Sequence, residues 1–133
     1  MKKHIKVKKR DLIYPDLSYK IVGILFDVFK DLGPGYQEKY YQKAISLSSK
    51  GNNLKFKEQV SIPLEYKSHK IGSVILDFLI ENKIVLEIKK GNYFSPNNIK
   101  QISAYLRATN LKLGLLANFT SGGVKIKRIV NIL

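Results

Sequence analysis

The stretch that decides the fold reads VILDFLIENKIVLEIK and covers residues 74–89. It holds two apolar runs, at 74–80 and 84–88, which are separated by a short polar segment at 81–83. Short runs rich in β-branched and aromatic residues are typical of strands, and nearly continuous apolar runs favour strands that are buried on both faces. The stretch therefore predicts an antiparallel hairpin in the centre of a sheet.

Charged residues interrupt this hairpin at three positions. Asp77 stands in the middle of the first run, where a buried carboxylate without a partner is costly. Glu87 and Lys89 stand two positions apart at the end of the second run, so the strand period places them on the same face. The register of the hairpin decides whether Asp77 joins them.

The length of the turn sets that register. A three-residue turn pairs Ile80 with Ile84, and counting back along both strands pairs Asp77 with Glu87. A two-residue turn would instead place the two carboxylates on opposite faces. Three-residue turns usually need a residue with positive φ, which Asn82 tolerates. The prediction that the two acids share a face therefore depends on the longer turn.

Two acids opposed across a hairpin repel each other, so a purely structural sheet would avoid them. A divalent cation reverses this argument, because Mg²⁺ or Mn²⁺ binds carboxylates, a backbone carbonyl and water, with phosphate oxygens completing the shell. Asp77 and Glu87 would be ligands, and Ile88 could supply the carbonyl. The metal would polarise a phosphate and acidify a bound water, while Lys89 would orient that water or stabilise negative charge. Such a site predicts phosphodiester hydrolysis.

Two helices are expected before the hairpin. Apolar residues recur at helical spacing over 16–32, with Asp16 or Ser18 placed to cap the first turn and Gly33 placed to end the helix. After a sharp turn, residues 36–50 are expected to form a second helix. The short connection predicts that the two helices pack as a helical hairpin.

The other predicted segments are strands at 54–66 and 111–119, a polar turn at 67–70 and a basic alternating segment at 124–133. Ser95 and Pro96 are placed as the N-cap and first residue of a helix that Asn110 ends. This order predicts an α/β fold of the α+β type, with a central mixed sheet of about four to five strands flanked by helices on both sides.

Composition limits the classes of protein to which this chain can belong. Its 133 residues suit one domain, predicted at 11–133 after a flexible basic arm at 1–10. The absence of cysteine excludes disulfides, thiolate zinc sites and cysteine nucleophiles. With no secretory signal and no apolar run of membrane-spanning length, we expect a cytoplasmic protein without a membrane partner.

The formal net charge of +14 predicts a polyanionic partner. Nucleic acid is the first candidate, because a basic surface that neutralises phosphates releases their counterions. The alternative is a lysine-rich composition without such a role. Tyr36, Tyr40 and Tyr41 lie on or beside the second predicted helix, where they could stack on bases or belong to the core.

The hairpin resembles a known superfamily. Asp77 followed by Glu87-x-Lys89 is similar to the signature of the PD-(D/E)XK nucleases, whose restriction-endonuclease-like core has the order helix, three strands, helix, strand. This resemblance implies a magnesium-dependent nuclease in which Asp77 and Glu87 bind the metal. It also implies that Lys89 is the catalytic lysine.

A second motif resembles the GxxExxY proteins within that superfamily. Gly35, Glu38 and Tyr41 fit the pattern that names them. Further matching segments lie in order along the chain, at 32–35, 106–109, 114–116 and 127–131. The resemblance implies that Glu38 is a helix-borne acid of the site and a candidate additional metal ligand. An ordinary surface acid is the alternative.

Gln101 and Tyr105 stand one helical turn apart and resemble the glutamine and tyrosine pair of many such nucleases, so Gln101 is a candidate catalytic residue. The leading hypothesis is a metal-dependent nuclease acting on DNA rather than RNA, as a monomer or homodimer. The second is an inactive nuclease-fold module that binds nucleic acid. In a structural protein, Glu87 and Lys89 would form a solvated pair and Asp77 would bond to a helix N-terminus.

Overall fold

A computed structural model describes residues 13–131 of the chain. The predicted arm at 1–10 lies outside the described residues. In chain order the elements are α1 (Pro15–Leu32), α2 (Glu38–Gly51), β1 (Phe56–Tyr66), β2 (His69–Ile80), β3 (Ile84–Lys90), α3 (Pro96–Thr109), β4 (Leu113–Phe119) and β5 (Val124–Val130). No helix within 13–131 is both long enough and apolar enough to cross a membrane.

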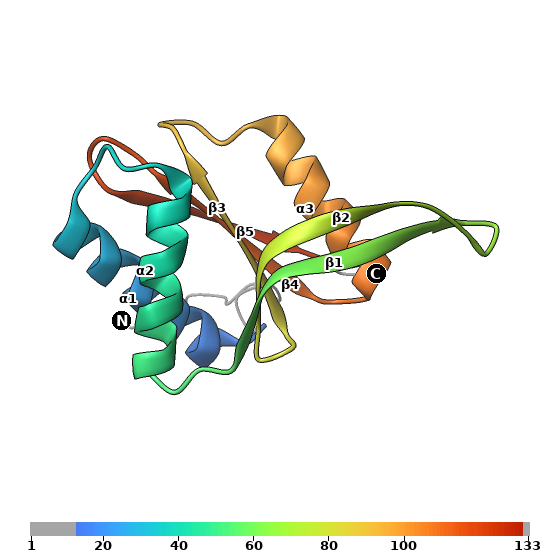
Figure 1. Ribbon diagram of the computed structural model, residues 1–133, viewed down its shortest axis with the longest axis horizontal. Helices are drawn as coiled ribbons and strands as arrows, with labels where there is room; N and C mark the ends of the chain where they lie inside the picture. The colour runs from blue at the N-terminus through green and yellow to red at the C-terminus, as the bar shows by residue number, and fades with distance from the viewer. Residues whose placement is uncertain (1–12, 132–133) are drawn as a thin grey trace, which may run out of the picture.

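The strands form one five-stranded mixed sheet in the order β1-β2-β3-β4-β5. Neighbours are antiparallel except for β3 and β4, which α3 connects and which run parallel. All residues of β4 are buried, as are the first five of β3, because helices cover both faces of the sheet centre. The structure thus confirms the predicted α+β fold, and β5 supplies the fifth strand (Figure 1).

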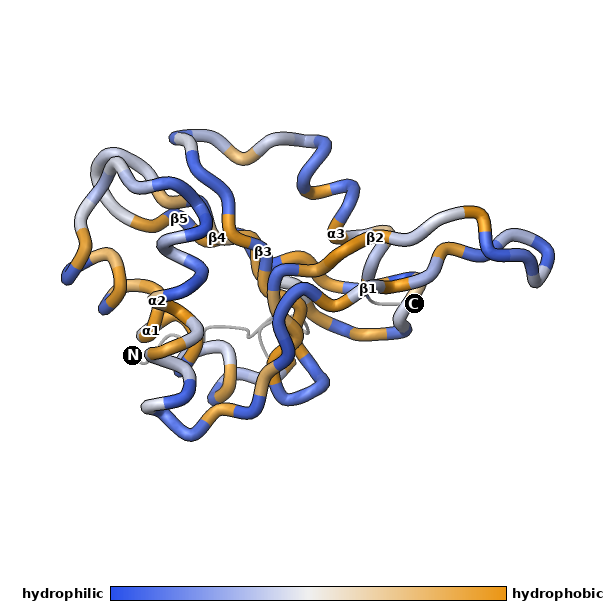
Figure 2. Tube along the Cα trace, viewed as in Figure 1, coloured by the Kyte–Doolittle hydropathy of each residue, from blue (hydrophilic) through white to orange (hydrophobic). Residues whose placement is uncertain are grey.

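Two hydrophobic layers hold the helices to the sheet. On one face, α1 and α2 pack against residues that include Phe78, Leu86 and Leu115. On the other face, α3 packs against residues that include Val85 and Leu116. Figure 2 shows hydrophobic residues gathered where helices meet strands and hydrophilic residues at the far end of the β1–β2 hairpin.

The start of α1 differs from the sequence prediction. Tyr14, in the left-handed conformation with φ of 48°, is the N-cap of α1, and no side chain caps the helix. The prediction of a cap from Asp16 or Ser18 is therefore wrong; Ser18 is buried instead and its hydroxyl donates to the carbonyl oxygen of Pro15 (3.1 Å). Gly33 ends the helix as predicted, with φ of 76°.

The β1–β2 hairpin is longer and less buried than predicted. Its turn is the dipeptide Lys67-Ser68, with φ of 49° and 65°, rather than a polar loop over 67–70, and Tyr66 pairs with His69. Figure 1 shows this end of the hairpin extending away from the rest of the sheet. Ile75 is 55% exposed there, so the expectation that 74–80 is buried on both faces is wrong for its first part.

Gly114 fixes the distance between α3 and β4. A Cβ atom on Gly114 would lie 2.5 Å from Cγ2 of Ile102, a β-branched side chain that cannot turn away. We expect Gly114→Ala to lower the free energy of unfolding by about 1–3 kcal/mol, the usual effect of overpacking a core. Urea denaturation would measure this change. Gly23→Ala on α1 is the matched control, because nothing lies within 4 Å of its Cβ position.

Candidate active site

The turn between β2 and β3 has the predicted length. Ile80 pairs with Ile84, and the Lys83 N–H donates to the Ile80 carbonyl oxygen (2.9 Å). Both Glu81 and Asn82 have positive φ, where the sequence predicted it for Asn82 alone. Glu81 is tied to the start of β1: its N–H donates to the Lys55 carbonyl (2.8 Å), and its carboxylate accepts from the Lys55 N–H (2.8 Å). These bonds compensate for an unusual backbone conformation at Glu81.

The two carboxylates replace the backbone ladder where β2 and β3 separate. Regular pairing runs from the turn as far as Phe78 and Leu86, so the register directs Asp77 toward Glu87. Beyond that point, the Asp77 N–H donates to Oε1 of Glu87 (2.9 Å). The Ile88 N–H donates to Oδ2 of Asp77 (2.8 Å). Each acid thus accepts a hydrogen bond from the backbone of the other strand, and the two carboxylates lie side by side.

The pairing of β1 with β2 is also interrupted at Asp77. Glu58 pairs with Phe78 and Val60 pairs with Leu76, while Gln59, with φ of 50°, leaves Asp77 without a partner in the β1–β2 ladder. The strand changes face at this point. Phe78 packs on the α1 and α2 side whereas Leu76 packs on the α3 side, although residues two apart normally share a face. Asp77 therefore occupies a bend in the sheet.

Burial of both acids, together with the charge of Asp77 acting on Glu87, keeps a proton on the acid pair. Burial raises the pKa of Asp77, and the charge of Glu38 raises it further. Burial, followed by the charge of Asp77, raises the pKa of Glu87 to about 8. The charge of Lys89 lowers the pKa of both acids, by less than burial raises it. The ammonium group of Lys89 therefore lies in their neighbourhood. The metal-free pair therefore holds a proton at neutral pH, and a cation would favour its release.

Because Glu87 holds this proton, we expect Glu87→Gln to become more stable relative to wild type as the pH rises. The pKa of Glu87 is about 8 in the folded protein against an ordinary 4.5, so the folded state retains a proton that the unfolded chain has lost. The free energy of unfolding therefore falls as pH rises through this window and levels off above it. Gln mimics the protonated acid and removes this dependence. Urea denaturation in EDTA should show the variant gaining on wild type from about pH 5 to about pH 9.

Glu65→Gln, at an exposed acid of β1, is the control for that experiment. Its stability relative to wild type should change little over the same pH range, because an exposed carboxylate is well solvated in both states. A Glu87→Gln difference that stays constant with pH would contradict the buried proton.

Glu38 approaches the pair from the first turn of α2. Its Oε2 accepts from the Lys90 N–H (3.2 Å), and its charge acts on Asp77. Tyr41 fixes the start of this helix: its hydroxyl donates to the Gly33 carbonyl (2.7 Å), and its ring stacks on Phe119 with centroids 4.1 Å apart. Tyr41 thus anchors α2 one turn after Glu38, and this holds Glu38 near the site.

The structure separates the two candidates on α3. Tyr105 is buried, and the charges of Glu87 and Asp77 add to burial in raising the pKa of its hydroxyl. Gln101, one turn earlier, is exposed, and no hydrogen bond within 13–131 joins it to the acids. Tyr105 is therefore near the carboxylates in this structure, whereas Gln101 is not shown to contact them.

The donor set has the chemistry that a divalent cation needs. Asp77 and Glu87 offer hard oxygen donors, and the Ile88 carbonyl points to the same side of β3 as its N–H, toward Asp77. Within the described part of the chain, however, no three His, Cys, Asp or Glu side chains gather closely enough to hold a metal ion. The residues therefore fit a site of two carboxylates, a carbonyl and water, with Glu38 at a greater distance.

Sequence reasoning missed two residues of the strands around the site. Gln59 creates the gap opposite Asp77, and no sequence signal marks its positive φ. Asn118 pairs with Lys89 across β3 and β4, and it is 1% exposed. Its amide donates to the Tyr93 carbonyl (2.8 Å), and its Oδ1 has no partner among the described residues. An amide inside the apolar strand LGLLANF was a signal that could have identified it.

Comparison with known proteins identifies the family of this chain. Residues 15–129 match the family described as the PD-(D/E)XK nuclease superfamily. A crystal structure of SSO0001 is similar to this chain with a TM-score of 0.56 and 17% identity, covering 98% of this chain and 71% of that one. At this identity the likeness concerns the fold alone. No match was found among curated proteins. Since the matched region covers most of the chain, the chain belongs to the PD-(D/E)XK nuclease superfamily.

Proposed function

We propose that the protein is a metal-dependent nuclease that hydrolyses phosphodiester bonds of nucleic acid, with DNA preferred to RNA. The observation that carries the proposal is the buried pair of Asp77 and Glu87, with the pKa of Glu87 raised to about 8. Acids opposed across two strands destabilise a sheet, so their presence indicates a function. Acids with pKa values perturbed in this way are typical of functional sites. Membership of a nuclease superfamily supports the same conclusion.

The proposed ligands are the Asp77 and Glu87 carboxylates and the Ile88 carbonyl, with Glu38 as an additional ligand. A bound Mg²⁺ or Mn²⁺ would polarise the phosphate and lower the pKa of a bound water. Lys89 holds its ammonium group beside the acids, where it orients the attacking water or stabilises negative charge on the phosphate.

Two further residues, Tyr105 and Gln101, belong to the proposed site. Tyr105, on whose hydroxyl the charges of both acids act, would stand on the α3 side of the site. Gln101 remains a proposed catalytic residue, which would have to reach the substrate from its exposed position on α3. Membership of the GxxExxY proteins is also part of this proposal. It is supported by the way Tyr41 anchors the helix that carries Glu38.

The net charge of +14 supports a nucleic-acid substrate. Binding through phosphates should weaken steeply as salt concentration rises, because each neutralised phosphate releases counterions. The proposed enzyme therefore needs its basic surface for affinity and its acids for chemistry. The two properties can be separated by mutation.

One observation favours a second candidate, an inactive module that binds nucleic acid. Asp77 and Glu87 each accept a backbone hydrogen bond, which satisfies part of the need of a buried carboxylate without metal. Such a protein would retain salt-dependent binding and cleave nothing. The geometry of the acids alone is compatible with this outcome, while their raised pKa values favour the enzyme.

A metal titration with a nuclease panel tests the proposal. Labelled single-stranded DNA, duplex DNA and RNA are incubated with the protein in EDTA and then with increasing Mg²⁺ or Mn²⁺. Cleavage is expected with either metal and not in EDTA, with DNA cleaved faster than RNA. Cleavage that persists in EDTA would overturn the metal site. Binding to every substrate without cleavage at any metal concentration would establish the second candidate instead.

A further inference from the structure

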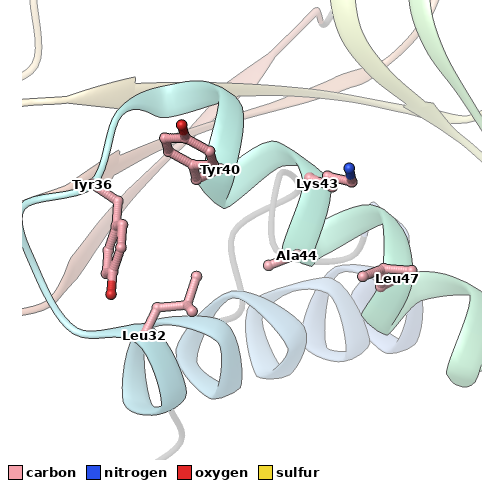
Figure 3. Close-up of a pocket in the computed structure, with 6 residues that line it drawn as sticks. All are labelled: Leu32, Tyr36, Tyr40, Lys43, Ala44 and Leu47. Atoms are coloured by element: carbon pink, nitrogen blue, oxygen red, sulfur yellow. The ribbon is translucent and has the colours of Figure 1, made fainter.

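The outer side of α2 carries two adjoining hollows. The first, which we call the tyrosine pocket, has a volume of about 480 Å³ and is lined by Leu32, Tyr36, Tyr40, Lys43, Ala44 and Leu47 (Figure 3). The second, the lysine groove, has a volume of about 420 Å³ and lies between α2 and β1. Lys43 and Leu47 line both, so the two hollows lie next to each other along α2.

The tyrosine pocket presents aromatic rings to solvent. Tyr36 and Tyr40 are 44% and 50% exposed, and their ring centroids lie 6.4 Å apart at an angle of 75°. Figure 3 shows the two rings at one end of the pocket, with Leu32 of α1 below Tyr36 and Ala44 on the wall that α2 provides. A flat aromatic ligand can place one face against a ring and its edge against the aliphatic residues.

Of the neighbouring tyrosines on this helix, Tyr40 has no packing role among the described residues of the kind that Tyr41 has. Tyr41, its neighbour in the sequence, performs the structural role, because it is 1% exposed and stacks on Phe119. Tyr40 points away from that core, and its ring instead has the Lys39 ammonium 5.3 Å from its centroid. A half-exposed tyrosine with a cation on its face is suited to a ligand that combines an aromatic ring with negative charge.

The lysine groove supplies positive charge along the same helix. Lys39, Lys43 and Lys50 line it, and Glu58 is its single acid among the described residues. Gln42 and Gln59 add amides, which are 3.4 Å from each other and can bond to phosphate or sugar oxygens. Charge complementarity therefore selects a polyanion over an apolar protein segment.

The groove begins beside the acids. Lys39 directly follows Glu38, whose carboxylate bonds to the Lys90 N–H at the end of β3. Gln59, on the opposite wall, is the residue that leaves Asp77 unpaired in the β1–β2 ladder. A chain that follows the groove toward the N-terminus of α2 therefore arrives at the acid pair.

We propose that this face of α2 binds single-stranded nucleic acid, with an unpaired base in the tyrosine pocket and phosphates along Lys39, Lys43 and Lys50. A basic track combined with exposed aromatic rings is how proteins hold single strands, whose bases have free faces to stack. Bases inside a duplex are covered by their neighbours and cannot enter. As a statement about the strand that reaches the acids, the inference rests on the proposed nuclease function.

Binding without cleavage tests the inference. Fluorescence anisotropy in EDTA compares labelled oligothymidylate and oligouridylate with a duplex of the same length. We expect Tyr40→Ala to raise the dissociation constant for both single strands by about 5- to 150-fold, as loss of one base–aromatic stack does. Tyr40→Phe, which keeps the ring, should bind far more tightly than Tyr40→Ala. Tyr19→Ala, at a tyrosine that is 82% exposed on α1, is the matched control.

A salt titration tests the phosphate contacts separately. Lys43→Gln should lower the slope of log affinity against log salt by about 0.7, the value for one phosphate of a single strand. Lys20→Gln, at an exposed lysine of α1, should leave the slope unchanged. A slope unaffected by Lys43→Gln would overturn the groove as the path of the backbone.

Three results would overturn the base pocket. Tyr40→Ala could bind single strands as wild type does, or it could lose duplex binding to the same degree. Alternatively, it could alter sedimentation of the free protein and leave oligonucleotide binding intact, in which case the pocket holds a protein segment or a second copy of the chain. The nuclease proposal fails in a different way: binding through Tyr40 would persist, but Mg²⁺ and Mn²⁺ would support no cleavage.

Discussion

Replacing Asp77 with Asn is expected to lower the rate of metal-dependent cleavage by more than about 100-fold, because even groups that only support a metal ligand contribute about 10- to 100-fold. The Asn side chain can still accept the Ile88 N–H bond that Asp77 accepts at 2.8 Å, so the local backbone should be retained. What is lost is a negative charge that the proposed cation requires. Cleavage of a labelled substrate over time, at several Mg²⁺ concentrations, measures the effect.

Asp27→Asn is the matched control, because Asp27 is an exposed acid on α1 far along the sequence from the site. It should cleave at the wild-type rate. Thermal unfolding of Asp77→Asn should show a folded protein, and oligonucleotide binding in EDTA should persist. A variant that cleaves at the wild-type rate would remove Asp77 from the proposed machinery and overturn the metal site built on this acid pair, although the nuclease activity itself would stand.

Replacing Tyr41 with Ala is expected to lower the free energy of unfolding by about 3–5 kcal/mol, as for other large buried aromatic residues. The ring is 1% exposed and stacks on Phe119, and the hydroxyl bonds to the Gly33 carbonyl and accepts from the Tyr36 N–H (3.4 Å). Losing these contacts leaves a cavity between α2 and β4. Urea denaturation measures the loss.

Two variants calibrate this result. Tyr41→Phe keeps the ring and loses only the hydroxyl, so it should cost about 1 kcal/mol, the usual contribution of a hydrogen bond. Tyr19→Ala, at an exposed tyrosine, should change stability by less than about 0.5 kcal/mol. If Tyr41→Ala cost no more than Tyr41→Phe, the ring would contribute nothing and the explanation of the Gly35, Glu38 and Tyr41 motif would be wrong.

The acid pair was predictable from sequence because a strand has an exact period of two. Once the turn between Ile80 and Ile84 is three residues long, the side of the sheet that Asp77 and Glu87 share follows by counting, and the structure confirms the turn. The order of helices and strands along the chain and the helical layers were predictable for a similar reason, since apolar periodicity reports which faces are buried.

The bend at Asp77 was not predictable, because periodicity assumes a regular ladder. Nothing in the local sequence around Gln59 requires a positive φ; the bend depends on how β1, β2 and β3 pair in three dimensions. The same limit explains Ile75, whose apolar character predicts burial although the hairpin carries it beyond the helices. Asp16 as a helix cap failed for a related reason, because Tyr14 determines how the chain enters α1.

How well the outer site residues could be placed from the sequence differs between α2 and α3. Glu38 could be placed by its motif, since Tyr41 sits one turn later on a well-anchored helix. Gln101 was proposed from its spacing to Tyr105 and from a resemblance, and a spacing identifies a helix face without fixing its distance from the sheet. Tyr105 lies on nearly the same face and is close to the acids, while Gln101 is exposed.

The irregular course of β1 also affects aggregation, in which strands of other chains add to the edge of a sheet. An edge strand with a long run of free backbone groups is a template for strand addition. In β1 the run is broken by the left-handed Gln59, by Pro63, which has no N–H to offer, and by a register shift between Leu64 and Glu65. The distortion that leaves Asp77 without a partner in the β1–β2 ladder therefore also shortens the free backbone edge of β1, so amyloid-like stacking through β1 is disfavoured.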